Sequence, residues 1–233
     1  MIDLRVIADA SWPSAIADEW ARRLERDPAL RMCLPTGSTP VPVYEDMSER
    51  GGFADTTIFL LDEFGLPSGD PGRCDAMLER DLLSRLPERP AQVEMLDPQA
   101  KDLQAECRRF DQAIADGGLG LSLLGFGRNG HLGMNEPGSD VDSPTRVVNL
   151  AQETIEGLRR YGADTTTTWG MTIGLGPLLA SSEIWLLVSG ERKATILDRA
   201  LNGPVSPSVP ASLLRTCDRV TVWADESAAS HLR

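Results

Sequence analysis

Short apolar runs alternate with longer amphipathic segments along the whole chain. Six of these runs have the length and composition of buried strands, and most end in glycine, proline, aspartate or serine. They are Leu4–Ala8, Leu30–Leu34, Thr57–Leu61, Leu119–Leu124, Ile184–Val188 and Val220–Trp223. Strands that alternate with helices are typical of α/β proteins with a mainly parallel sheet. We therefore predict one Rossmann-like, doubly wound domain over residues 1–233, with helices on both faces of the sheet.

Two of the segments between these runs have the apolar spacing of helices that pack on a sheet. In Ile16–Leu24 an apolar side chain recurs every four residues, behind Ser11 and Pro13, which suit a helix cap and a first-turn proline. In Pro98–Asp116 the apolar positions are spaced by four, three and four residues. Cys107 is one of them, so we expect it in the core and not as a reactive thiol.

The segment Asn149–Trp169 breaks the alternation. It is polar, contains Gly157 and Gly162, and includes the run of four threonines at Thr165–Thr168. A polar, glycine-containing stretch of this kind suits a flap over a site, so we predict a small lid over residues 149–169.

Composition narrows the classes of function. Of 233 residues, 41% are hydrophobic and 25% are charged, which is ordinary for a globular protein. The formal net charge of −12 repels phosphate backbones and anionic lipids, so we expect no nucleic-acid or membrane partner. No apolar run approaches the ~18 residues of a transmembrane helix, and the first residues lack a signal-peptide pattern, which predicts a cytoplasmic protein. The four cysteines are scattered without a CxxC pair and indicate neither a disulfide framework nor a metal site.

Candidate chemistry gathers in loops that follow the apolar runs, where ligands bind in open α/β sheets. The first loop, Leu34–Pro40, combines a glycine with several hydroxyl side chains after a strand. Backbone N–H groups and hydroxyls there suit an anion such as a phosphate. A plain helix cap formed by Ser38 or Thr39 explains the same residues, and this loop alone does not separate the two interpretations.

The second loop contains two adjacent carboxylates, Asp62 and Glu63, at the end of an apolar strand. Neighbouring side chains of a strand point in opposite directions, so one of the two is expected to face the crevice. We assign Asp62 to the crevice as a general base, because partial burial raises a carboxyl pKa towards working pH. Glu63 is assigned a structural role. The competing interpretation is that both carboxylates simply solvate a loop.

The third loop, Leu124–Pro137, is rich in glycine and contains His131, one of only two histidines. Histidine suits proton shuttling near neutral pH, and glycines let the backbone approach a ligand closely. Glu136, five residues after His131, is placed to orient one imidazole nitrogen. Asn129 precedes His131 by two residues. These neighbours distinguish His131 from a structural histidine, whereas His231, near an expected helical C-terminus, is assigned a structural role.

The fourth loop, Ser189–Lys193, joins an apolar strand to a helix start through a glycine. Lys193 is one of only two lysines, and a cation at a helix N-terminus opposes the macrodipole unless an anion binds there. We therefore expect Lys193 to contact a bound anion, with a solvated surface lysine as the alternative.

In this order and spacing, the four loops resemble the glucosamine-6-phosphate deaminase (isomerase) family, whose wider fold group includes 6-phosphogluconolactonase. The resemblance extends from Leu34 to about Ser227. Its most specific piece is Asn129-Gly130-His131 followed by Asn135-Glu136-Pro137, because the lactonases share the glycine-histidine loop without the Asn-Glu-Pro ending.

The resemblance implies conversion of glucosamine 6-phosphate to fructose 6-phosphate and ammonia, with no cofactor or metal. Asp62 would take the proton from C2 and return it at C1. His131 would shuttle the proton that opens the pyranose ring, assisted by Glu136 and Asn129. The phosphate of the hexosamine 6-phosphate would be held by residues of the first loop, the fourth loop and the lid: Thr36, Gly37, Ser38, Thr39, Lys193 and Arg160.

Two departures from the family leave alternatives open. Asn129 stands where many members have aspartate, and an amide cannot relay a proton, so its role would be positional. Residues Gly69–Cys74 lack a serine-aromatic pair that is common there, so galactosamine 6-phosphate, giving tagatose 6-phosphate, is an alternative substrate. The further alternatives are a 6-phosphogluconolactonase and a non-catalytic sugar-phosphate-binding module. The oligomeric state stays open between a monomer, a dimer and a larger homo-oligomer.

Overall fold

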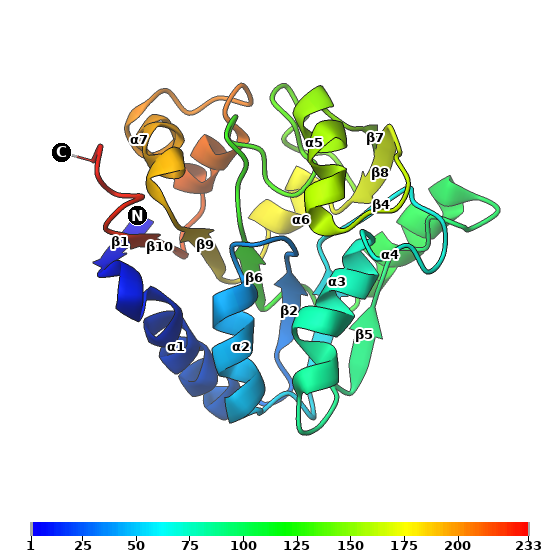
Figure 1. Cartoon of the computed structure of the whole chain (residues 1–233), viewed down its shortest axis with the longest axis horizontal. Helices are drawn as coiled ribbons and strands as arrows, with labels where there is room; N and C mark the ends of the chain where they lie inside the picture. Colours follow the sequence, from blue (N-terminus) through cyan, green and yellow to red (C-terminus); the bar gives the residue numbers. More distant parts are fainter. Residues whose placement is uncertain (1, 233) are drawn as a thin grey trace.

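A computed structural model of the chain describes residues 2–232, and its core is a seven-stranded sheet (Figure 1). The strands of this sheet are β1 (Ile2–Ile7), β2 (Arg31–Leu34), β3 (Thr57–Leu60), β5 (Gln92–Glu94), β6 (Leu121–Leu124), β9 (Ile184–Val188) and β10 (Val220–Asp225). Their order is β1-β10-β9-β6-β2-β3-β5, and every neighbouring pair is parallel. The predicted parallel α/β sheet is confirmed.

Helices cover both faces of the sheet, as a doubly wound fold requires. The α-helices are α1 (Trp12–Arg26), α2 (Val41–Arg50), α3 (Cys74–Asp81), α4 (Leu103–Ala115), α5 (Gln152–Gly157), α6 (Leu175–Leu179) and α7 (Ala194–Asn202). Short 3-10 turns occur at η1 (Asp9–Ser11), η2 (Leu83–Arg85), η3 (Leu158–Tyr161), η4 (Glu191–Lys193) and η5 (Pro210–Thr216). Within residues 2–232, none of the helices is both long and apolar enough to cross a bilayer.

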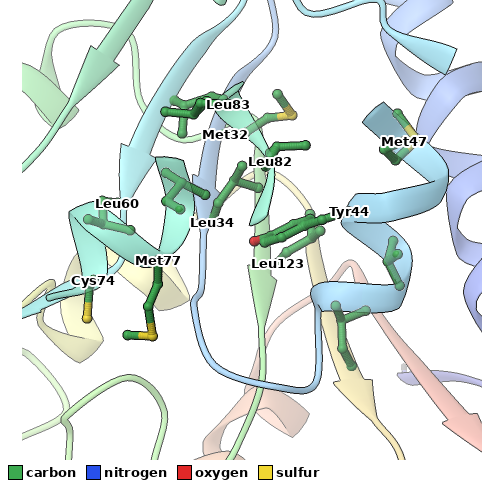
Figure 2. Packing of buried hydrophobic residues seen from close by; sticks show 14 of the residues in the cluster. Met32, Leu34, Tyr44, Met47, Leu60, Cys74, Met77, Leu82, Leu83 and Leu123 are labelled. Carbon is green, nitrogen blue, oxygen red and sulfur yellow. The ribbon is translucent and has the colours of Figure 1, made fainter. Parts of the chain in front are cut away.

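Alternating strand residues supply two separate hydrophobic clusters, one on each face. Met32 and Leu34 of β2 pack with α1, α2 and α3, while Cys33 between them packs on the opposite face with α4, α6 and α7. Figure 2 shows the first of these clusters, in which Leu34 and Leu123 lie beside Tyr44 of α2. Because both faces of the central strands are covered, these strands read in the sequence as continuous apolar runs.

The order of the strands creates a switch point between β2 and β6. From β2 the chain builds outward through β3 to β5, then returns to β6 on the other side of β2 and continues to β9 and β10. Ligands of open α/β sheets bind beyond the carboxyl ends of the strands at such a point. The loop that follows β2 is the first loop of the sequence analysis (Leu34–Pro40, the glycine-hydroxyl loop). The loop that follows β6 is the third (the histidine loop, which contains His131), so the strand order brings the two loops together.

A second, three-stranded antiparallel sheet was not predicted from the sequence. It has the order β4-β8-β7, with β4 (Asp62–Phe64), β8 (Trp169–Thr172) and β7 (Arg146–Asn149). Asp62 pairs with Thr172 in this sheet, which fixes the backbone that carries the candidate base. The segment predicted as a lid connects β7 to β8 and contains α5 and η3.

The N-terminal region differs from prediction in two details. The run Leu4–Ala8 forms β1, but the strand is not buried, because β1 lies at the edge of the sheet and leaves Leu4 40% and Val6 50% exposed. Pro13 lies in the first turn of α1 as predicted. The predicted cap is wrong, because the Ser11 side chain makes no capping hydrogen bond.

Two further predictions about helix ends differ from the structure. The helix expected over Pro98–Asp116 begins only at Leu103, because the Asp102 carboxylate accepts the N–H of Ala105 and caps it there. Cys107 is buried in the core, as predicted. Between β10 and residue 232 the chain forms turns and not a helix, so His231 does not lie near a helical C-terminus.

Candidate active site

A cavity of about 220 Å³ lies at the carboxyl ends of the central strands, at the switch point between β2 and β6. Its lining includes eight of the residues singled out in the sequence: Thr36, Gly37, Ser38, Thr39, Asp62, His131, Glu136 and Lys193. Arg160 lines only the wider mouth outside this cavity. Asn129 does not line the cavity but forms hydrogen bonds with the Glu136 carboxylate and the backbone N–H of His131.

The glycine-hydroxyl loop after β2 forms one wall of the cavity. The buried Tyr44 hydroxyl of α2 donates to the Pro35 carbonyl oxygen at 2.6 Å, which fixes the start of the loop. Gly37 has a φ of +92°, a left-handed conformation that a residue with a side chain rarely adopts. The following residues therefore turn sharply around the cavity.

The hydroxyls of this loop do not cap the next helix. α2 begins at Val41, the residue at its cap position is Pro40, and no side chain makes a capping hydrogen bond there. The interpretation of Ser38 or Thr39 as a plain helix cap is therefore wrong. Ser38 and Thr39 instead line the cavity, where they suit an anion.

Asp62 is half-buried where the main sheet passes into the small sheet. Burial raises the pKa of Asp62 to about 6, although a hydrogen bond from Cys74 and the charge of His131 act to lower it. The Cys74 sulfur lies 3.6 Å from Asp62 Oδ1. A carboxyl group with a pKa this near neutrality can both accept and return a proton.

Glu63 points away from the cavity and is fully buried. Its carboxylate accepts the backbone N–H of Phe64 and Cys74, both at 2.8 Å, and that of Asp75 at 3.0 Å. The Arg73 guanidinium lies 3.6 Å from it. The predicted structural role of Glu63 is confirmed, and the interpretation that both carboxylates solvate a loop is wrong.

His131, Glu136 and Asn129 form one hydrogen-bonded group. Glu136 Oε1 lies 3.0 Å from His131 Nδ1, and Glu136 Oε2 accepts from Asn129 Nδ2 at 2.7 Å. Asn129 Oδ1 also accepts the backbone N–H of His131 at 3.1 Å. Burial acts to raise the pKa of Glu136, but the hydrogen bond and charge of His131, with Asn129, hold it below its usual value. Glu136 is therefore an anion that orients the imidazole through Nδ1 and leaves Nε2 for proton exchange.

Glycine is required beside the imidazole ring. A Cβ atom at Gly127 would lie 2.0 Å from His131 Nε2, closer than any non-bonded contact allows. The backbone of the loop therefore lies directly against the ring, which limits the orientations that His131 can take.

Lys193 supplies a partly buried cation to the cavity. Its Nζ donates to the Phe126 carbonyl oxygen at 2.6 Å. Burial lowers the pKa of Lys193, and the nearby charge of Arg128 lowers it further. Arg128 and Arg160 line the mouth beside it, so a chain of net charge −12 gathers cations where an anion would enter. Across residues 2–232, no three His, Cys, Asp or Glu side chains are grouped as metal ligands.

The lid segment is attached to the loop that precedes α3. The Asp70 carboxylate accepts the backbone N–H of Asp164 at 3.3 Å and of Thr165 at 3.1 Å, and the Thr165 hydroxyl at 2.8 Å. A Cβ atom at Gly72 would lie 2.4 Å from Ala163 Cβ, so the two backbones are in direct contact. The predicted lid segment is therefore held against the Gly69–Cys74 loop, of which Cys74 lines the cavity.

Several lining residues were not singled out in the sequence, among them Phe64, Cys74, Met77, Thr154 and Tyr161. Tyr161 lies on the lid and stacks on Phe64, with ring centroids 6.1 Å apart and an interplanar angle of 24°. An aromatic residue next to Arg160 in a polar segment was a usable signal for it. No local pattern marks Cys74, because its contact with Asp62 depends on where α3 packs.

The comparisons with known proteins agree on one family. Residues 9–223 match the family model for glucosamine-6-phosphate isomerases/6-phosphogluconolactonase. The glucosamine-6-phosphate deaminase of Beutenbergia cavernae is 37% identical over 243 aligned residues, which cover 100% of this chain and 93% of that protein. The glucosamine-6-phosphate deaminase of Streptomyces coelicolor is 38% identical, with 94% of this chain and 87% of that protein covered.

Solved structures show the same relationship. A monomeric glucosamine-6-phosphate deaminase superposes with a TM-score of 0.91 at 32% identity, covering 99% of both chains. A 6-phosphogluconolactonase from Thermotoga maritima superposes with a TM-score of 0.77 at 19% identity, covering 97% of this chain and 99% of that chain, a likeness of fold alone. The chain, with its parallel sheet and its histidine loop at the switch point, belongs to the glucosamine-6-phosphate isomerase/6-phosphogluconolactonase family.

Proposed function

We propose that this chain is a deaminating aldose–ketose isomerase that converts glucosamine 6-phosphate and water to fructose 6-phosphate and ammonia. The observation that carries the proposal is the meeting of two proton-transfer groups in one cavity, Asp62 with a pKa near 6 and His131 oriented by Glu136. The curated relatives named glucosamine-6-phosphate deaminase, at 37% and 38% identity, support the same substrate.

The phosphate group binds first to the cationic end of the cavity. Backbone N–H groups and hydroxyls of Thr36, Gly37, Ser38 and Thr39 surround the phosphate oxygens, and Lys193 Nζ meets them from the opposite wall. Arg160, at the mouth, adds a second cation from the lid. A lysine that is already partly buried has lost part of its hydration, so its interaction with a dianion is strong.

His131 opens the pyranose ring. Its Nε2 takes the proton of the hydroxyl on C1 and delivers a proton to the ring oxygen as the bond between C1 and that oxygen breaks. The Glu136 carboxylate on Nδ1 stabilises the imidazolium that forms between these two transfers. Asn129 holds Glu136 through the 2.7 Å hydrogen bond, which is a positional role and needs no proton of its own.

Asp62 carries out the isomerisation. Its carboxylate takes the proton from C2 of the open chain while O1 of the aldehyde accepts a proton from the ammonium group on C2, which leaves an enolamine between C1 and C2. The same carboxyl group returns the proton at C1, which gives an imine at C2 that water hydrolyses to the ketone with release of ammonia. One group can serve in both directions because its pKa of about 6 lies near working pH.

We further propose that residues 1–233 act as one domain, with residues 149–169 as the lid, in the cytoplasm. The proposed site draws all of its residues from this chain, so one copy suffices for turnover. The solved deaminase that it resembles is described as monomeric. A single species of monomer mass in light scattering of the active enzyme is the expected result.

The test is product release from three substrates in parallel. Purified protein is given glucosamine 6-phosphate, galactosamine 6-phosphate and 6-phosphogluconolactone, and ammonia, fructose 6-phosphate, tagatose 6-phosphate and 6-phosphogluconate are measured. We expect equimolar ammonia and fructose 6-phosphate from the first substrate. Preference for the galacto epimer would move the assignment to that substrate, acid from the lactone alone would make the chain a lactonase, and no product would leave a binding module.

A further inference from the structure

The candidate base has a single side-chain donor, and that donor is a cysteine. Cys74 is the first residue of α3, its side chain is 1% exposed, and its sulfur lies 3.6 Å from Asp62 Oδ1. Among residues 2–232, no other side chain donates a hydrogen bond to the Asp62 carboxylate. Figure 2 shows Cys74 next to Met77 on α3, at the border of the buried cluster.

The thiol at this position stays protonated. Burial raises the pKa of Cys74 well above its usual value, and the charges of Asp62 and Glu63 raise it further. A protonated thiol can donate to a carboxylate, although more weakly than a hydroxyl does. The direction of the bond is therefore fixed, with Cys74 as donor and Asp62 as acceptor.

Glu63 holds this donor in place. One of its oxygens accepts the backbone N–H of Cys74 at 2.8 Å, and the other accepts that of Asp75 at 3.0 Å. A carboxylate that accepts two N–H groups at the first turn of a helix fixes the position of that helix end. Because Glu63 directly follows Asp62 in β4, the same short strand carries the base and the anchor of its donor.

We propose that Cys74, anchored by Glu63, positions the general base by donating its thiol proton to Asp62 Oδ1, which leaves Oδ2 as the oxygen that takes and returns the substrate proton. The inference rests on the proposed function and adds a positioning residue to it. Cys74 touches Asp62 and takes no part in the proton transfer itself. A carboxylate with one oxygen held can approach C2 and C1 in turn by a small shift, without rotating between the two transfers.

The test compares Cys74→Ala, which removes the donor, with Cys74→Ser, which retains one, through the pH dependence of kcat/KM for ammonia release. Loss of the hydrogen bond raises the pKa of Asp62, so the acid limb of Cys74→Ala moves upward by about half a pH unit or more, with about threefold lower kcat/KM below it. The limb of Cys74→Ser stays at the wild-type pH or moves lower, because a hydroxyl is the better donor.

A matched control separates positioning from packing. Cys107→Ala removes a cysteine of α4 that is similarly buried, at 2% exposure, and lies outside the cavity, so its acid limb stays unchanged. Acid limbs that coincide in wild type and Cys74→Ala would overturn the proposal. So would an equally raised limb in Cys74→Ala and Cys74→Ser, because the donor would then be irrelevant.

A second readout does not depend on turnover. The carboxyl carbon of Asp62 is titrated by ¹³C NMR, with its signal identified by its loss in Asp62→Asn. The pKa is expected near 6 in wild type and higher in Cys74→Ala. Identical titrations would contradict the positioning role, whereas a wild-type protein that releases no ammonia contradicts the proposed function instead.

Discussion

The two sides of the cavity are built differently. On the strand side, Asp62 and His131 contact partners that are themselves buried or half-buried: Cys74, whose backbone N–H donates to Glu63, and Glu136, which accepts from Asn129. On the lid side, residues 149–169 present the exposed Arg160 and Tyr161 on a polar segment. That segment is attached through the Asp70 hydrogen bonds, the stacking of Tyr161 on Phe64 and the burial of Leu158 in the core.

The difference separates chemistry from binding. Asp62 needs a raised pKa, which burial beside the strands supplies, and His131 needs a fixed orientation, which Glu136 supplies. A cation that meets a phosphate needs reach, so Arg160 can lie on an exposed, adjustable segment, whereas Lys193 is partly buried beside the strands. Variants on the strand side are therefore expected to change kcat, and variants around the phosphate are expected to change KM.

The largest effect is expected from Asp62→Asn. An amide cannot take a proton from C2, so kcat falls by about a thousandfold. Substrate binding, measured by calorimetry, stays within about threefold of wild type because the phosphate contacts remain. A variant that retained more than a tenth of wild-type kcat would show that Asp62 is not the base.

The next effect is expected from His131→Gln, which removes the group that opens the ring. We expect kcat to fall by about a hundredfold with little change in KM. In Glu136→Gln we expect kcat to fall by about tenfold, because the imidazolium loses its anionic partner at Nδ1. His231→Gln, an exposed histidine away from the cavity, is the matched control and keeps wild-type kcat. Equal losses in the two histidine variants would remove the special role of His131.

A change in binding and not in kcat is expected from Lys193→Met. The charge-assisted contact with the phosphate is lost, and KM rises by about tenfold or more. Lys101→Met, the exposed second lysine, leaves KM unchanged. An unchanged KM in Lys193→Met, or a loss confined to kcat, would break the division between proton transfer and phosphate binding.

The smallest effect is expected from Asp70→Asn, which loosens the attachment of the lid. An amide turns one N–H₂ group towards backbone donors, so residues near Thr165 exchange their amide hydrogens faster and KM rises by about threefold. Asp55→Asn, an exposed aspartate, is the control. Unchanged amide exchange in Asp70→Asn would show that the lid is held by other contacts.

Most of the fold could be predicted because the central strands are buried on both faces. Their apolar runs mark the strands directly, and parallel strands bring the loops at their carboxyl ends to one edge. The division between Asp62 and Glu63 followed from strand alternation, and the structure places Glu63 in the protein and Asp62 at the cavity. The catalytic roles of Asp62 and His131 stay predictions that activity measurements must test.

What could not be predicted depends on contacts between distant segments. Leu4 and Val6 are exposed because β1 lies at the edge of the sheet. No local sequence pattern predicts the order of strands in a sheet. The small sheet has strands of three or four residues, too short for a periodic signal. Cys74 reaches Asp62 where Glu63 binds the start of α3, a contact between residues 12 apart that depends on how α3 packs.

The most direct test of the account is turnover of glucosamine 6-phosphate in D₂O, followed by NMR of the products. A single carboxyl group that moves a proton from C2 to C1 predicts equimolar ammonia and fructose 6-phosphate. At most one of the two C1 hydrogens of the product then carries deuterium, always in the same stereochemical position. Product deuterated at both C1 positions, deuterium scrambled between them, or the absence of ammonia would contradict the account.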